Sequence, residues 1–197
     1  IGLSLFFCLN TSFAQENELI KLVSYPVEKK VDVLVGGRPF TTFLYSDNLE
    51  KPVLYPIHAA NGTTVTRGFP LNTQPGDPTD HPHHLGLWLN FENVNGLDFW
   101  NNSYAIPNER KPSYGWIKTD KLLKISGGET GILSYHANWT NHQHHVLLEE
   151  TTRLEFTGTM HRRIIDRITV LKANITVLFT DAKDGLLGLR LAHALEM

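Results

Sequence analysis

The sequence predicts an all-β protein, a mostly antiparallel β-sandwich. Short apolar runs rich in β-branched and aromatic residues recur along the chain, and Gly- and Asn-containing turns separate them. No stretch combines a helical apolar period with helix caps over three turns. Short strands separated by turns bury one face each by packing into a sandwich or barrel. With 197 residues, 41% of them hydrophobic, the chain suffices for one domain with a sizeable core.

The expected strands are defined by alternation and by the turns between them. The clearest alternation lies at residues 85–91, where every second side chain is apolar. Gly36-Gly37 and Asn61-Gly62 are turn signals. In the first half we expect the other strands at residues 31–35, 40–45, 52–57 and 63–67. In the second half we expect strands at residues 116–125, 131–140, 144–156, 160–171, 173–180 and 186–195.

The first residues of the chain predict a secreted or periplasmic protein, and the last residues predict an incomplete domain. Residues 1–14 resemble the apolar part of a secretion signal with cleavage after Ala14, which leaves residues 15–197 as a single sandwich domain. The only cysteine is Cys8, so the mature chain would have no thiol nucleophile, Cys-zinc site or disulfide. Residues 185–197 resemble a strand without a polar tail, so we expect the domain to be incomplete at its C-terminus.

Charge and hydropathy exclude two classes of partner. The chain has 18 Lys and Arg residues against 20 Asp and Glu, and no basic stripe interleaves with aromatic residues. This balance argues against a nucleic-acid-binding protein. After residue 14 no apolar run approaches the 18 or so residues of a transmembrane segment. We therefore expect a small-molecule or oligosaccharide substrate.

A long loop, residues 68–85, carries the most informative segment of the sequence. It contains Asp80, His81, His83 and His84, with several prolines that restrict the backbone. If this segment enters a strand, His81 and His83 lie on one face and His84 on the other. Two such imidazoles can transfer protons near neutral pH, hydrogen-bond sugar hydroxyls or ligate a metal. The alternative is that they hold the loop by bonding backbone carbonyls.

A second histidine cluster, residues 142–145, leaves a metal site open. If the two clusters converge, His81, His83, His142 and His144 are the candidate ligands. The alternative is a solvated hairpin turn, because the neighbouring side chains are polar. We therefore name no cofactor beyond this possible metal ion.

The remaining candidates suit a sugar ring. Arg67 ends a strand at the mouth of the histidine loop and can bind a carboxylate or a hydroxyl. Trp100 lies next to Asp98 in a second loop, where an aromatic face and a carboxylate fit a sugar, or where the ring packs into the core. Lys183 lies in the turn at residues 181–185. The candidate substrate-binding residues are His84, Trp100, Asp98 and Lys183. The candidate catalytic residues are His81, His83, Asp80 and Arg67.

Four segments resemble the PmoA-like family, which carries the label "methane oxygenase PmoA". They are Lys51-Pro-Val-Leu-Tyr-Pro, Val65-Thr-Arg-Gly-Phe-Pro, Asp80-His-Pro-His-His-Leu-Gly-Leu-Trp and Asn93-Val-Asn-Gly-Leu-Asp-Phe-Trp. The run from Asp181 to Arg190 resembles a later segment of that family. The resemblance implies a β-supersandwich akin to galactose mutarotases and, by analogy of fold, a protein of carbohydrate use.

Three functions stay open at this stage. The first is an epimerase, lyase or hydrolase of a carbohydrate, in which His81 or His83 transfers a proton, Arg67 and Asp80 orient the reacting groups, and Trp100 stacks on the sugar. Mutarotase-like chemistry also needs a carboxylate base, which we expect beyond residue 197. The second is a metal-dependent copper or iron oxygenase, as the family label suggests. The third is a non-catalytic glycan-binding module.

Overall fold

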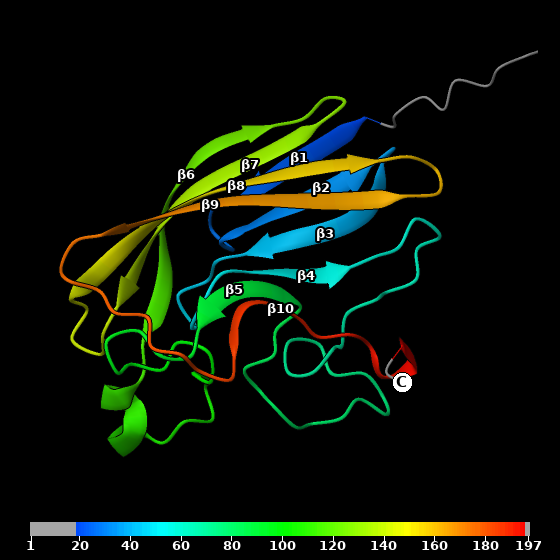
Figure 1. Ribbon diagram of the computed structural model, residues 1–197. Coiled ribbons are helices and arrows are strands. Elements are labelled where there is room, and N and C mark those ends of the chain that lie inside the picture. Colours follow the sequence, from blue (N-terminus) through cyan, green and yellow to red (C-terminus); the bar gives the residue numbers. More distant parts are fainter. Residues whose placement is uncertain (1–18, 196–197) are drawn as a thin grey trace, which may run out of the picture.

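The computed structural model describes residues 19–195, and the predicted secretion signal at residues 1–14 lies outside them. Two sheets and two short 3₁₀ helices make up the described chain (Figure 1). The elements are β1 (Ile20–Tyr25), β2 (Lys30–Val35), β3 (Arg38–Leu44), β4 (Val53–Ile57), β5 (Leu87–Phe91), η1 (Asn108–Ser113), β6 (Trp116–Ser126), β7 (Gly131–Thr140), β8 (Val146–Gly158), β9 (Arg163–Ala173), β10 (Gly185–Leu189) and η2 (His193–Leu195).

The predicted antiparallel sandwich is confirmed. The first sheet has the order β1-β2-β3-β4-β5-β10, the second has the order β6-β7-β8-β9, and neighbouring strands are antiparallel. Figure 1 shows the second sheet lying across β1–β4. Within residues 19–195 no helix has the length and apolar character needed to cross a bilayer.

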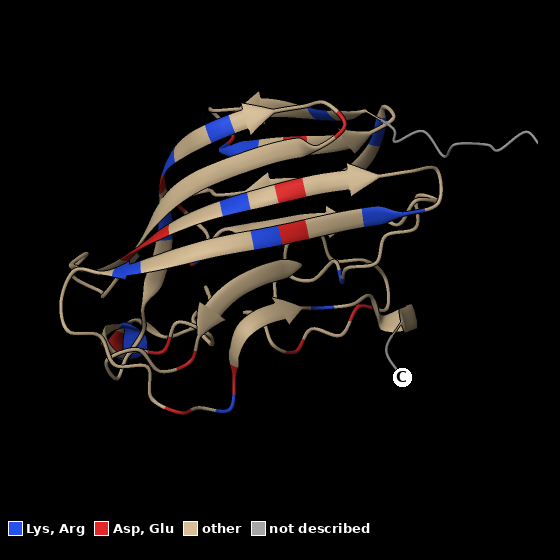
Figure 2. Cartoon of the chain, turned by 45° about the horizontal axis from the view of Figure 1, so that its top comes forward, with Lys and Arg blue, Asp and Glu red and all other residues tan. Residues whose placement is uncertain are grey.

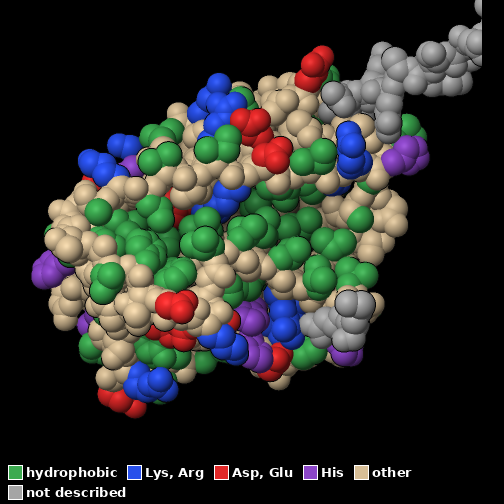
Figure 3. All heavy atoms as spheres, in the orientation of Figure 1, with side chains coloured by type: hydrophobic (Ala, Val, Ile, Leu, Met, Phe, Trp, Pro, Cys, Tyr) green, Lys and Arg blue, Asp and Glu red, His purple; other side chains and the backbone are tan. Residues whose placement is uncertain are grey.

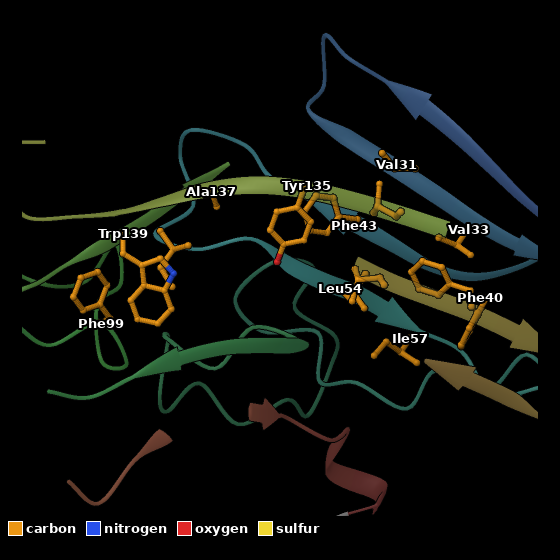
Figure 4. Packing of buried hydrophobic residues seen from close by; sticks show 14 of the residues in the cluster. Val31, Val33, Phe40, Phe43, Leu54, Ile57, Phe99, Tyr135, Ala137 and Trp139 are labelled. Atoms are coloured by element: carbon orange, nitrogen blue, oxygen red, sulfur yellow. The ribbon is translucent and has the colours of Figure 1, made fainter. Parts of the chain in front are cut away.

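The core lies between the sheets and is rich in aromatic rings. Phe43 of β3 stacks on Tyr135 of β7, with ring centroids 4.7 Å apart (Figure 4). Farther along β7, Trp139 packs against Phe99, with centroids 4.9 Å apart. All four rings are buried. Phe43, Tyr135 and Trp139 lie at strand positions that point to the inner face, and Phe99 comes from the loop after β5.

One charged group lies inside this core, whereas most charged residues of β8 and β9 (Figure 2) are exposed to some degree. The carboxylate of Glu150 on β8 is fully buried and accepts four hydrogen bonds. The donors are the Tyr135 hydroxyl at 2.8 Å, the Trp139 indole at 2.9 Å, the Thr152 hydroxyl at 2.7 Å and Arg167 Nη2 at 2.7 Å. A buried carboxylate is tolerated only when such donors replace its water.

The predicted strands differ from the observed ones in four places. The predicted strand at 186–195 extends too far, because β10 ends at Leu189 and His193–Leu195 form η2. β1 was not predicted, because its alternation is weak and its pairing with β2 stabilises it. Residues 63–67 form no regular strand: Thr64 and Thr66 make isolated bridges to His58 and Leu191. The predicted strand at 173–180 is also wrong. β9 continues to Ala173, and residues 174–184 are irregular.

Candidate functional site

The histidine loop connects Arg67 to β5 and is held by its own hydrogen bonds. Asp77 Oδ2 accepts the backbone N–H of Phe69 at 3.0 Å and that of Gln74 at 2.8 Å. Gly86 follows the loop with φ of +56°, and a Cβ there would lie 2.2 Å from the Leu54 carbonyl oxygen. A glycine is therefore required where the chain turns into β5. On the face shown in Figure 3, histidine side chains gather with basic and acidic ones near the C-terminal end.

Arg67 is the buried centre of this loop. Its side chain is fully buried, and Nη1 donates to Asp80 Oδ1 at 2.7 Å and to the Pro78 carbonyl at 3.2 Å. Nη2 donates to the His81 carbonyl at 3.0 Å. Arg190 Nη2 reaches the same Asp80 oxygen at 3.3 Å. The guanidinium groups thus fix the carboxylate and the backbone that carries His81.

Asp80 and His81 form a dyad. Asp80 Oδ2 lies 2.5 Å from His81 Nδ1. The hydrogen bond with His81 holds the pKa of Asp80 below its usual value, and the charges of Arg190, His81 and Arg67 act in the same direction. Because Nδ1 bonds the carboxylate, the tautomer with a proton on Nδ1 is favoured, and Nε2 of the exposed ring is left as a proton acceptor.

The three imidazoles form one cluster, but not in the predicted arrangement. His81 stacks on His84 with centroids 4.9 Å apart, and His83 packs edge-on against His84 at 4.3 Å. The expected alternation of faces is wrong. His84 N donates to the His81 carbonyl at 3.0 Å, so residues 81–84 form a turn, and His81 has φ of +47°. The turn brings together rings that a strand would have separated.

His83 and His84 are neutral at physiological pH. Burial lowers the pKa of His83 to about 3 and that of His84 to about 4. The neighbouring histidines and the positive charges of Lys51 and Arg67 lower both pKa values further. Each neutral ring offers one hydrogen-bond donor and one acceptor, which suits hydroxyl groups.

A buried base of aromatic rings supports the cluster. His84 stacks on Trp88 at 5.2 Å, and Trp88 packs against Trp100 at 5.2 Å. Lys51 lies below them, with Nζ 5.4 Å from the Trp88 ring and 3.3 Å from the Trp100 carbonyl that it bonds. Burial lowers the pKa of Lys51 to about 7. Trp100 is only 7% exposed, so it supports His84 here and offers little free face for stacking on a sugar.

The other predicted residues lie apart from the cluster or serve their own loop. Asp98 accepts the backbone N–H of Asn101 at 2.8 Å and its side-chain amide at 2.9 Å, and burial raises the pKa of Asp98. Lys183 is exposed before β10, at the end of the β5–β10 pair opposite to the histidine loop.

The second histidine cluster does not join the first. Residues 142–145 form an exposed turn between β7 and β8, as the alternative reading predicted, and His142 packs against Trp116. Throughout the described part of the chain, no group of three or more His, Cys, Asp or Glu side chains is arranged to hold a metal ion. The metal centre of His81, His83, His142 and His144 therefore has no geometric support between residues 19 and 195.

Two residues of the site were missed. Lys51 comes directly before the apolar sequence Pro52-Val-Leu-Tyr-Pro56, and this context was a signal that it would be buried. Arg190 alternates with apolar residues, a pattern typical of a strand with one exposed face, yet it contacts Asp80. No local pattern in the sequence indicates that contact, because 110 positions separate the two residues.

The depressed pKa values predict acid sensitivity. On unfolding, the pKa of His83 rises from about 3 to 6.5, and that of His84 rises from about 4 to 6.5. Between these pH values the unfolded chain therefore binds more protons than the folded chain. Their stabilising contribution is complete above about pH 6.5 and is lost as the pH falls towards about 4. We expect the Tm to fall between about pH 7 and about pH 5, and to fall less in His83→Gln.

Thermal unfolding at several pH values measures this effect. Carboxylates remain mostly ionised above about pH 5, so they contribute little within the window. The control is His142→Gln, which alters an exposed histidine of the other cluster and should keep the wild-type pH dependence. Equal pH dependence in His83→Gln and the wild type would contradict the assignment.

Comparison with known sequences places this chain in a family. The sequence model described as "Family of unknown function (DUF6807)" matches residues 30–197. The chain belongs to this family. The DUF6807 match includes β2–β10 and the whole histidine loop. Comparison with curated proteins and with solved structures finds no match. The DUF6807 description states no activity, so the resemblance to the PmoA-like family stays a prediction.

Proposed function

We propose that this DUF6807 protein acts outside the cytoplasm on a carbohydrate or carbohydrate derivative, and that His81 transfers a proton to or from it. The supporting observation is the chain of contacts from Arg67 through Asp80 to His81, with 2.7 Å and 2.5 Å between the bonded atoms. A carboxylate that bonds one imidazole nitrogen orients the ring and stabilises its protonated form. The exposed Nε2 is then suited to act as a general base.

The neighbouring rings support a hydroxylated substrate. His83 and His84 lie within 5.6 Å of the His81 ring, measured between centroids, and both are neutral at physiological pH. They can donate to and accept from hydroxyls while His81 takes the proton. The reaction class is proton transfer at a hydroxyl or at an acidic carbon of the sugar, as in an epimerase or a lyase.

The test is a reaction screen with the purified full chain. Proton NMR in D₂O follows anomer interconversion and deuterium exchange in D-glucose, D-galactose and D-glucuronate, and cleavage of the glycosidic bond in cellobiose. We expect one of these reactions to be accelerated. The rate should fall at least about tenfold in His81→Ala and in Asp80→Asn, because a positioned general base contributes roughly 10²–10⁴-fold.

The matched control is His142→Ala, which removes an exposed imidazole from the other cluster. Its rate should equal that of the wild type. A wild-type rate in His81→Ala would show that His81 is not the proton-transfer group. If His81→Ala abolishes the reaction but still binds the sugar, the binding and chemical roles are separate.

A further inference from the structure

A cavity of about 620 Å³ lies under the first part of the histidine loop. Its volume is within the roughly 300–1,000 Å³ that is typical of small-molecule sites. The histidines of residues 81–84 do not line it. Its walls include Tyr55, His58, Asn72, Gln74, Asp77 and Ala194.

The wall that the loop contributes is preformed. Asp77 bonds two backbone N–H groups of the loop, and Asn72 N donates to the Gly68 carbonyl at 2.7 Å. The chain is so close at Gly68 that a Cβ there would lie 2.2 Å from the Asn72 carbonyl oxygen and 2.6 Å from Asp77 Oδ2. On the opposite wall, the Thr64 hydroxyl lies 3.1 Å from His58 Nδ1 and orients that ring. A preformed wall reduces the entropy cost of binding.

The chemistry of the lining suits an uncharged ligand. None of the described lining residues is Lys, Arg or Glu, and the only carboxylate, Asp77, already accepts two hydrogen bonds. Uncharged amides are presented by Asn72 and Gln74, both exposed. The rings of the lining prolines, Pro56 and Pro75, can contact C–H groups, whereas Tyr55 is only 7% exposed and closes the inner end of the wall. A saccharide presents hydroxyl groups beside apolar C–H faces, so its chemistry matches this combination of amides and apolar rings.

We propose that this cavity binds a neutral saccharide of one or two rings, at a site separate from His81. The inference goes beyond the proposed function, because it requires no reaction at the histidine cluster. It adds a binding site on the same loop, with the amides of Asn72 and Gln74 facing the ligand's hydroxyls.

Saturation-transfer NMR with the purified full chain tests this proposal. The probes are D-glucose, D-galactose and cellobiose, with D-glucuronate as the charged comparator. We expect saturable binding of at least one neutral saccharide, and weaker binding of D-glucuronate. In Asn72→Ala the affinity should fall about fivefold, which corresponds to one lost hydrogen bond. Ala194→Trp, which places an indole in the cavity, should remove the binding at this site.

Three controls isolate the cavity. Gln143→Ala removes an exposed amide from another loop, and Ala105→Trp adds an indole to a different exposed position. Both should bind as the wild type does. The binding that Asn72→Ala weakens should persist in His81→Ala, which separates this site from the proposed reaction. The proposal is overturned if no neutral saccharide binds saturably, if D-glucuronate binds more tightly, or if Asn72→Ala and Ala194→Trp bind like the wild type.

Discussion

Replacement of Glu150 by Leu is expected to lower the free energy of unfolding by about 3–5 kcal/mol, the usual cost of breaking a buried ion pair from one side. The carboxylate is fully buried and bonds Tyr135, Trp139, Thr152 and Arg167. Leu has a similar volume, so little cavity forms. The loss comes from donors that no longer have an acceptor, above all the guanidinium of Arg167, whose side chain is 14% exposed.

Urea denaturation measures this change, and two variants identify its cause. Glu149→Leu alters the neighbouring glutamate, which is partly exposed and makes surface contacts with Lys172 and Asn174. It should cost much less than Glu150→Leu, because solvent screens an exposed ion pair. The double variant Glu150→Leu with Arg167→Met should recover part of the loss, because it removes the unpaired charge. Equal stability of Glu150→Leu and Glu149→Leu would contradict the role of this carboxylate in the core.

Replacement of Arg67 by Met is expected to destabilise the protein by about 2–3 kcal/mol and to release the histidine loop. Met fills much of the same space but donates no hydrogen bond to Asp80, Pro78 or His81. Two of these acceptors are backbone carbonyls of the loop, and the third is the carboxylate that orients His81. The dyad should therefore lose its geometry together with the loop.

Limited proteolysis measures how readily the histidine loop is cleaved, and urea denaturation measures the free energy of unfolding of the whole domain. In Arg67→Met we expect faster cleavage within residues 68–84 than in the wild type. The control Arg153→Met removes an exposed ion pair with Glu155 on β8, where the bonded atoms are 2.6 Å apart. It should change stability by less than about 1 kcal/mol and leave the loop resistant. Unchanged cleavage in Arg67→Met would show that other contacts hold the loop.

Local pattern predicted the strands where alternation is strong and failed where pairing is irregular. β5 follows the alternation of its apolar residues, and β7 was predicted with its observed bounds. Residues 63–67 have strand-forming residues, but they pair in single bridges with distant segments. Propensity describes one segment, whereas a strand also needs a partner of matching length.

The sequence alone determined the fold class and the position of the candidate site. The alternation of apolar and polar residues predicts a sandwich, and clustered histidines in a Pro-rich loop indicate where the chemistry would lie. Only the tertiary structure decided that residues 81–84 form a turn with stacked rings, that Arg190 reaches Asp80, and that Glu150 is buried among donors. These contacts join residues that are distant in sequence or separated by a turn, and packing between the elements determines their geometry.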